Sequence, residues 1–166
     1  MATQVPSGFN LDAFASGSFE GEGDTRRLQI ETKEYNAVVA GPFGEEGKTR
    51  LQATEKGGLM LVVVWNLDDE EQRQKLQLEK MPTRRQTIFL DLTPNGALDM
   101  GPYKNADLNR LRDVFGLNVP GKQWRFQDFV GQPARIKIDN RPNKEDPENP
   151  YQNVTAVTSM NAPQPA

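Results

Sequence analysis

The sequence contains neither cysteine nor histidine among its 166 residues. Without cysteine there is no disulfide framework, no thiol nucleophile and no thiolate metal ligand. Without histidine the chain lacks the usual general base, the imidazole ligand of most zinc sites, and the serine and cysteine triads. Carboxylates with magnesium, or lysine and tyrosine acid–base chemistry, remain for catalysis. We therefore expect a binding protein rather than an enzyme, with no cofactor and no metal.

Apolar residues are also scarce, with a hydrophobic fraction of 36% and a mean hydropathy of -0.72. These values indicate a modest core together with several solvated segments. No stretch approaches the roughly 20 apolar residues of a membrane helix. Residues 1–6 lack the basic and apolar regions of a signal peptide. We expect a soluble protein of one domain, located in the cytoplasm.

The two ends of the chain differ in composition from the middle. Residues 1–25 are rich in Gly and Ser and are predicted to be a flexible arm. Phe9, Phe14 and Phe19 lie five residues apart there, a spacing that fits neither a helix nor a strand. Residues 161–166 contain two prolines and are predicted to be a disordered tail. The folded domain is expected over the residues between, 26–160.

Several segments favour β-strands through Val-rich or alternating patterns. The strongest is residues 59–65 (LMLVVVW), whose two faces are both apolar. Either both faces are covered by protein, or one is offered to a ligand. Residues 35–40 and 49–54 are predicted to be the two arms of a hairpin. Further strands are expected at residues 86–93, with a short return at 97–100, at 134–138 and at 151–158.

A helix is predicted over residues 106–115. Its apolar stripe runs from Leu108 to Phe115 with helical spacing. Asn105 is a suitable N-cap, and Gly116 stands where a helix commonly ends. The polar stretch from residue 68 to residue 80 is predicted to be a short exposed helix.

The predicted order is three strands or strand pairs, the helix at 106–115, and then two strands. This is the order of an OB-type fold, a five-stranded, partly open Greek-key barrel. We therefore expect a mainly β, OB-fold-like domain with one α-helix between strands 3 and 4.

Charge is distributed unevenly along the chain. Residues 84–144 contain eleven Lys or Arg and six acids, whereas residues 1–83 contain nine bases and fourteen acids. Aromatic residues interleave with the later bases. Single-strand binders need this mixture, because bases stack on aromatic rings while Lys and Arg follow the phosphates. The predicted nucleic-acid-binding residues are Arg84, Arg85, Phe89, Tyr103, Lys104, Trp124, Arg125, Arg135 and Lys137.

Each of these residues also has a simpler interpretation. The cations fit an ordinary solvated surface. Phe89 is on the other side of its strand from Ile88 and Leu90, where a core residue is not expected, but it also fits packing under the N-terminal arm or under the 67–80 segment. Trp124 fits either a stacking position or a hydrophobic plug beneath the barrel.

The segment from residue 85 to residue 118 (RQTIFLDLTPNGALDMGPYKNADLNRLRDVFGLN) and the following PGKQW resemble a group of small phage proteins encoded among replication and recombination genes. The strand GQPARIKI and a final Y..V.AV extend the resemblance over about residues 55–158. Members of this group are regarded as single-stranded DNA-binding proteins or have no assigned function. The resemblance implies an OB-like barrel that coats or protects single-stranded DNA, in the host cytoplasm if the chain is phage-encoded, and it brings no catalytic residues.

In one respect the chain departs from many replication single-strand binders. Those proteins end in an acidic tail that recruits partners, whereas this chain ends in NAPQPA. Recruitment of replication or recombination proteins is therefore in doubt, and the acids at 68–71 are an alternative recruiting patch.

Two other functions remain open at this stage. The acidic first half and the three spaced Phe residues favour a protein–protein interaction module, either an adaptor or a host-factor inhibitor. Asp91, Asp99 and Asp107, which surround one turn, suggest a magnesium-dependent nuclease. Because such barrels host many functions, the fold alone does not choose between them.

Overall fold

The computed structural model describes residues 28–160, so the predicted arm (1–25) and tail (161–166) lie outside the described residues. The described chain is mainly β-structure, as the sequence predicts. Its elements in chain order are β1 (Glu34–Val39), β2 (Arg50–Ala53), β3 (Leu59–Leu67), α2 (Glu70–Lys75), β4 (Thr83–Phe89), α3 (Ala106–Val114), the 3₁₀ helix η1 (Phe126–Phe129), β5 (Pro133–Arg141) and β6 (Tyr151–Thr158).

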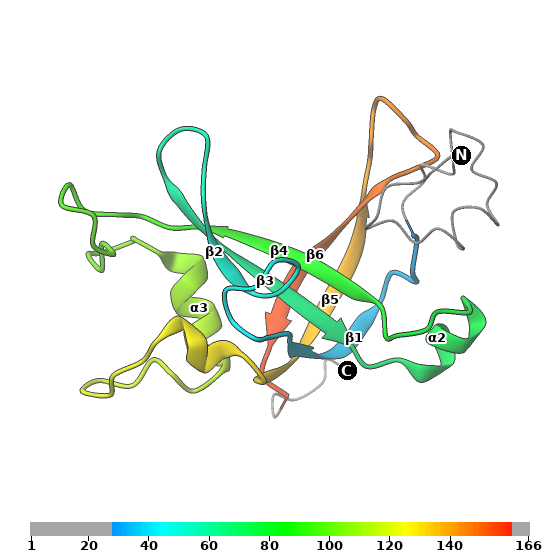
Figure 1. The fold of residues 1–166 in the computed structure, drawn as a ribbon, viewed down its shortest axis with the longest axis horizontal. Coiled ribbons are helices and arrows are strands. Elements are labelled where there is room, and N and C mark those ends of the chain that lie inside the picture. Colours follow the sequence, from blue (N-terminus) through cyan, green and yellow to red (C-terminus); the bar gives the residue numbers. More distant parts are fainter. Residues whose placement is uncertain (1–27, 161–166) are drawn as a thin grey trace, which may run out of the picture. The chain divides into compact units, whose positions relative to one another are not determined.

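The strands form one sheet (Figure 1), in which the path of paired strands is β2-β3-β1-β5-β6. β2 and β1 pair with successive parts of one edge of β3, and β4 pairs with the other edge. β3 pairs antiparallel with β1, β2 and β4, and β1 pairs antiparallel with β5. The sheet therefore has six strands where five were expected. In chain order, α3 and η1 lie between β4 and β5, and the short helix α2 lies between β3 and β4.

β1 and β2 are not the two arms of a hairpin, so that prediction is wrong. Both run antiparallel to β3 along the same edge, with Val39 opposite Trp65 and Arg50 opposite Val62. The intervening loop closes on itself, because the Thr49 N–H donates to the Ala40 carbonyl at 3.2 Å. The chain thus leaves the sheet after residue 40 and returns at β2 to the same edge of β3.

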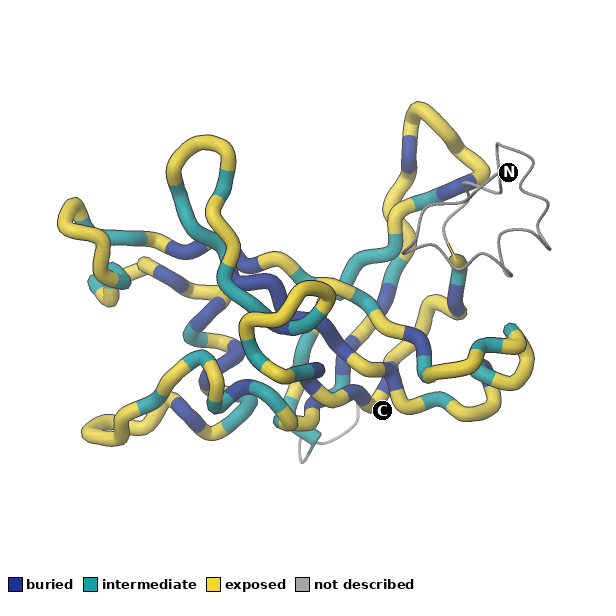
Figure 2. The backbone as a smooth tube through the Cα atoms, viewed as in Figure 1, coloured by how far each residue is buried: buried dark blue, intermediate teal, exposed yellow. Residues whose placement is uncertain are grey.

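One face of the sheet carries the hydrophobic core. Alternate residues of β5 from Ala134 to Ile138 are buried, as their pattern predicts. The same alternation of buried and exposed positions is visible along β1 and β5 in Figure 2. Trp65 of β3 is completely buried in this core, together with Leu108 of α3 and Phe129 of η1. The two helical segments therefore cover part of the inward face.

α3 confirms the predicted helix, which ends at Val114 and is followed by Gly116 at φ 70°. Asn105 is the N-cap residue of α3, as predicted, but without a side-chain cap. Asn105 adopts a left-handed conformation (φ 51°) and its side chain makes no capping bond to the helix. Instead it bonds to the segment that follows β4, as described below.

β4 ends at Phe89, four residues earlier than the predicted strand. Beyond it, Leu92 forms an isolated bridge with Leu98, and the Thr93 N–H donates to the Ala97 carbonyl at 2.7 Å. The turn that contains Pro94 and Gly96 therefore belongs to a small local hairpin, not to a continuation of β4.

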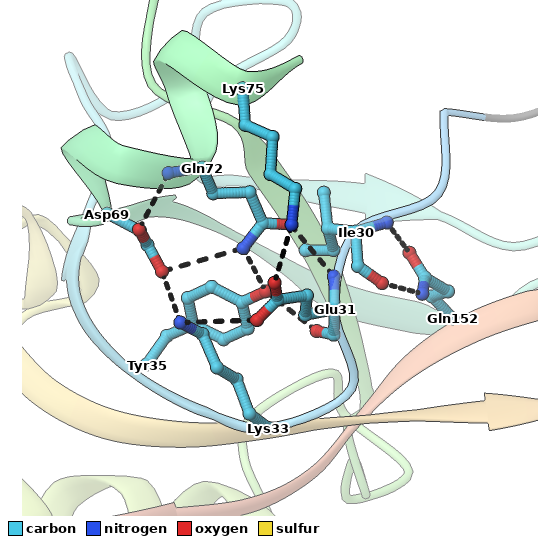
Figure 3. A network of polar contacts seen from close by, with 8 residues as sticks. All are labelled: Ile30, Glu31, Lys33, Tyr35, Asp69, Gln72, Lys75 and Gln152. Atoms are coloured by element: carbon cyan, nitrogen blue, oxygen red, sulfur yellow. Dashed lines mark hydrogen bonds and ion pairs between the residues drawn. The ribbon is translucent and has the colours of Figure 1, made fainter.

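α2 is held against the chain before β1 by a polar network (Figure 3). The side chain of Gln72, which is buried, accepts a hydrogen bond from the Glu31 N–H at 2.8 Å and donates to the Tyr35 hydroxyl at 2.8 Å. Asp69 caps the helix by accepting from the Gln72 N–H and pairs with Lys33 at 2.5 Å. The short helix α2 thus depends on tertiary contacts rather than on its own length.

Asp69 makes the stability of this network dependent on pH. The hydrogen bond from Lys33 and the backbone N–H of Gln72 lower its pKa below the ordinary value of 3.8. A carboxylate with a lowered pKa contributes stability that is present above its unfolded-state pKa and is lost as the pH falls through the folded-state value. We expect Asp69→Asn to flatten the loss of stability below pH 3.8, as measured by urea unfolding.

The Asp69→Asn result has two controls. Asp69→Ala removes the cap as well as the charge and should cost about 0.5–2 kcal/mol at neutral pH. Glu71→Gln, an exposed change in the same helix, should leave the acid limb unchanged. An acid limb that is identical in wild type and Asp69→Asn would contradict the assigned role.

The loop between β5 and β6 belongs to a separate small unit, which contains residues 28, 29 and 142–151 among the described residues. Within this unit, the Asn143 side-chain amide donates to the Asn149 carbonyl at 3.0 Å, and the Gln29 amide donates to the Pro150 carbonyl at 3.2 Å. These bonds order a polar loop that has little apolar surface to bury. None of the helices between residues 28 and 160 has the length and apolar character that crossing a membrane requires.

Candidate nucleic-acid interface

The side of β3 and β4 that points away from the core carries a second, smaller set of apolar residues. Met60, Val62 and Val64 alternate with the core residues of β3. Val62 and Val64 are buried with Ala40 in a cluster separate from the main core, whereas Met60 is half-buried at its edge. On β4, Phe89, Thr87 and Arg85 lie directly opposite these three β3 residues as cross-strand pairs. We call the following six residues the outer β3–β4 face: Met60, Val62, Val64, Arg85, Thr87 and Phe89.

Phe89 is the most prominent residue of this face. Its side chain is 71% exposed, although it lies opposite the half-buried Met60. The sequence-based alternative of packing under the 67–80 segment therefore finds no support, and the N-terminal arm, the other segment considered, lies outside the described residues. An aromatic ring this exposed on a sheet is a surface on which a planar ligand can stack.

Two arginines lie on the same side of the sheet as this ring. Arg85 is exposed, and its side chain has no ion-pair partner among residues 28–160. Arg50 of β2 lies opposite Val62, and its guanidinium donates to the Lys48 carbonyl at 2.9 Å and to the Gln52 side chain at 3.1 Å. Within the described chain, Arg85 is thus unpaired and Arg50 is oriented by hydrogen bonds, on either side of β3.

The loop before α3, which contains two more predicted residues, is tied to the chain just beyond the end of β4 that carries Phe89. Tyr103 is 99% exposed and has φ 66°, and Lys104 is exposed beside it. Asn105 fixes the position of this loop. Its side chain accepts from the Asp91 N–H at 2.8 Å and donates to the Asp91 carbonyl at 2.9 Å, and Asp91 is only two residues beyond Phe89.

Arg84 does not belong to this face. Because strand residues alternate, Arg84 points toward the side opposite that of Arg85 and is half-buried. Its guanidinium donates to the Gln152 side chain of β6 at 2.5 Å. Burial lowers the pKa of Arg84 from its ordinary value. An arginine guanidinium nevertheless stays protonated in proteins. The consecutive arginines 84 and 85 therefore have different environments.

Trp124 lies in a packed aromatic cluster. Its ring stacks on Phe129 at 5.8 Å between centroids and meets Phe126 edge-on at 5.1 Å. The buried Arg112 guanidinium lies over the same ring at 4.4 Å, a cation–π contact. This arrangement corresponds to the hydrophobic plug among the sequence-based alternatives. The neighbouring Arg125 is exposed and pairs with Asp128 at 3.5 Å.

Arg135 and Lys137 point outward from β5, as their alternation predicts, but at a distance from Phe89. They lie opposite Asn36 and Glu34 of β1. The Asn36 carbonyl accepts from the N–H of residue 68, whereas Phe89 lies opposite residue 60. Eight residues of strand correspond to about 26 Å. The structure therefore separates the predicted residues into several groups.

The surroundings of Arg135 and Lys137 also carry negative charge. Arg135 lines a polar hollow together with Lys33, Asp68 and Asp69. Lys137 lies 3.9 Å from the Asp139 carboxylate. Acids within reach of both cations weaken the attraction that this part of the sheet would exert on phosphates.

The three aspartates considered for magnesium have other partners. Asp91 accepts from the Asn105 N–H at 2.7 Å, Asp99 from the Gly101 N–H at 3.0 Å, and Asp107 pairs with Arg110 at 2.9 Å. Within residues 28–160, no three acids are grouped as a metal site would require. These carboxylates are thus accounted for by turn and helix contacts.

The sequence-based prediction missed the residues of this face that lie on β2 and β3. Met60 and Val62 belong to the run whose two apolar faces already raised the question of a ligand. Arg50 and Gln52 lie outside the basic region of the sequence, and only the register of β2 with β3 brings them to Val62 and Met60.

Comparison of the sequence with protein-family models gives no match, and comparison with curated proteins gives none either.

Proposed function

We propose that this protein binds single-stranded DNA on the outer β3–β4 face, without strong sequence preference and without catalysing a reaction. The observation that carries the proposal is the exposed Phe89 ring opposite the half-buried Met60, on the same side of β4 as the exposed Arg85, which has no ion-pair partner within residues 28–160. The resemblance to phage proteins of replication and recombination agrees with this role and suggests the host cytoplasm as its location.

In the proposed complex, one base stacks on Phe89 and a second stacks on Tyr103. Each stacked base contributes about 1–3 kcal/mol and depends little on base identity, because every base has a flat aromatic surface. Arg85, Arg50 and Lys104 follow the phosphates. A binder built in this way tolerates any sequence, because it reads no base edge.

The proposal places this face on a closed OB-type barrel. In such barrels the sheet surface of the second and third strands binds oligonucleotides. β3 and β4 take these two places if β1 and β2 together count as the first strand. The bond between Arg84 of β4 and Gln152 of β6 supports closure, because it joins the two outermost strands of the sheet.

The structure refines the list of residues in the proposed contact. Arg84 and Trp124 are omitted, because the first points inward and the second is packed against Phe129 and Arg112. Arg125, Arg135 and Lys137 are assigned at most to phosphates at the ends of a long strand. An aromatic contact for a peptide partner is the competing use of Phe89, and the titrations below separate the two.

We expect Arg85→Ala to weaken binding of labelled oligo-dT about tenfold, since it removes one charge-assisted contact. The slope of log K against log salt should also fall by about 0.7, the value for one phosphate on a single strand. Fluorescence anisotropy at several salt concentrations measures both quantities.

The matched control for this prediction is Arg110→Ala. Arg110 lies on α3, is exposed and pairs only with Asp107 within the described chain. Its loss should leave the slope unchanged. Equal effects of the two variants would show that binding follows net charge and not the outer β3–β4 face.

A further inference from the structure

β4 has one edge whose backbone groups find no partner within residues 28–160. The Leu90 N–H donates to the Leu59 carbonyl at 3.0 Å, which sets the alternation of the ladder between β4 and β3. The N–H and C=O groups of Arg85, Thr87 and Phe89 therefore point away from β3. In the described sheet, β4 pairs with β3 alone, and these groups make no other hydrogen bond. β4 is thus an edge strand with three pairing positions open.

The described part of the chain leaves this edge uncovered. Arg85, Thr87 and Phe89 are all exposed. The bond between Arg84 and Gln152 lies where β6 crosses the start of β4, and the two strands do not pair (Figure 1). Neither proline nor lysine lies between residues 85 and 89, and the register with β3 is continuous, so that no bulge interrupts it. Several devices that protect an edge strand from pairing are therefore missing here.

The sequence of this edge is complementary to itself in the antiparallel orientation. When Thr87 lies opposite Thr87 of a second copy, Arg85 of each chain lies opposite Phe89 of the other. Two threonines form a favourable cross-strand pair, and a guanidinium beside an aromatic ring makes a cation–π contact. In this register the open N–H and C=O groups of all three residues are paired.

The neighbouring registers are less favourable. Centring the pair on Arg85 places two guanidinium groups directly opposite each other, and like charges in that position destabilise a sheet. Centring it on Phe89 leaves Arg85 and Thr87 without a strand to pair with, because β4 ends at Phe89 and a local hairpin follows. The edge therefore specifies the register centred on Thr87.

We propose that two copies of this chain pair through their β4 edges, antiparallel and with Thr87 at the two-fold axis. Such an interface is isologous, so it closes at two copies and does not form a fibre. It joins the two sheets into one and sets the partner subunit's Arg85 beside Phe89. Within one chain, Arg85 lies four residues from Phe89, about 13 Å along the strand. The second copy thus contributes a cation to the aromatic ring that a single chain leaves without one.

The pairing itself needs no DNA, whereas its consequence for DNA rests on the proposed function. Residues that lie directly opposite each other in a sheet point to the same side. The two outer β3–β4 faces therefore become neighbours on one side of a continuous sheet. A single strand long enough to cross the axis contacts both faces, and the second contact is intramolecular once the first has formed. The dimer should therefore prefer long single strands to short ones.

The absence of cysteine allows a direct test of the pairing without DNA. Thr87→Cys puts one thiol of each chain at the axis, where the two Cα atoms are expected about 5.5 Å apart, within the reach of a disulfide. Thr83→Cys is the matched control, because Thr83 is an exposed threonine on the same side of the same strand. In the proposed dimer its two copies are eight residues apart, or about 26 Å.

Under mild oxidation of the full chain, T87C is expected to form disulfide-linked dimers, and T83C at equal concentration is expected to stay monomeric. Electrophoresis without reductant measures both yields. Equal rates of cross-linking in the two variants, or no dimer from T87C, would overturn the proposal.

A second pair of variants tests the interface without thiols. Thr87→Lys places two ammonium groups opposite each other at the axis, whereas Thr83→Lys adds the same charge beyond the paired residues. We expect T87K to weaken the dimer at least tenfold and T83K to leave it unchanged. Since a small interface associates weakly, sedimentation equilibrium of the full chain is measured up to about 1 mM. A wild type that is monomeric throughout, or equal weakening by T87K and T83K, would contradict the pairing.

The outcomes separate the pairing from the proposed function. Selective T87C disulfide formation in a protein that binds no oligo-dT would leave the pairing intact and refute the DNA-binding function. Oligo-dT binding by a protein whose T87C variant forms no dimer would do the reverse. If both hold, long oligo-dT should raise the yield of the T87C disulfide more than an oligo-dT that covers one face, and equal yields would refute the continuous binding surface.

Discussion

Phe89→Ala is expected to weaken the binding of oligo-dT by about 5- to 140-fold, which is the loss of one stacked base at 1–3 kcal/mol. The effect should be large because the ring is 71% exposed and opposite a half-buried methionine, so that most of one side is available to a base. The same exposure means that the ring contributes little to folding. The free energy of unfolding should therefore stay within about 0.5 kcal/mol of wild type.

Two control variants test whether the loss is specific to the aromatic ring of Phe89. Phe89→Tyr keeps the aromatic ring and should restore most of the affinity. Val119→Ala removes an apolar side chain of comparable exposure, 49%, from the loop after α3 and should have no effect. Wild-type affinity in Phe89→Ala, or a loss in Phe89→Tyr as large as in Phe89→Ala, would mean that no base stacks at this position.

Asn105→Ala is expected to destabilise the protein by about 3–5 kcal/mol, more than an average surface change, for two reasons. Asn105 is only 2% exposed, and its side chain satisfies backbone groups of Asp91 and Asp99 that would lose their partners. Its φ of 51° is also a conformation that Asn tolerates and Ala does not. Urea unfolding measures the loss.

Asn105→Gly separates the two causes, because glycine adopts positive φ without strain. We expect it to recover about 1 kcal/mol relative to Asn105→Ala. Asn118→Ala, an exposed asparagine beyond the same helix, should cost little. If Asn105→Ala proved as stable as Asn118→Ala, the link between the loop at 103–104 and the end of β4 would not be structural.

The fold class follows from periodicity, which is local information. The alternation in residues 134–138 and the apolar run at 59–65 predict strands that the structure confirms as β5 and β3. The relation of β1 to β2 could not be predicted, since it depends on the hydrogen bond between Thr49 and Ala40 and not on pattern. The end of β4 was misplaced because alternation continues into the hairpin that begins after Leu90.

The candidate interface was also predicted only in part, because alternation is local information and strand pairing is not. Alternation correctly placed Phe89 outward. It did not separate Arg84 from Arg85, because the strand was expected to begin at residue 86, whereas β4 begins at Thr83. Trp124 carries charged neighbours in sequence, but its ring contacts come from α3 and η1. Arg50 enters the site only through the register of β2 with β3. Long-range pairing, which single-residue patterns do not encode, therefore decides which cations share a side of the sheet with Phe89.

Backbone amide NMR of the full chain, titrated with oligo-dT, tests most directly whether single-stranded DNA binds the outer β3–β4 face. The predicted result is a set of salt-sensitive shift changes at residues 60–64, 85–89 and 103–104, with smaller changes along β5. Shift changes confined to β5 and the polar hollow at Arg135, or no change at any oligo-dT concentration, would contradict the account.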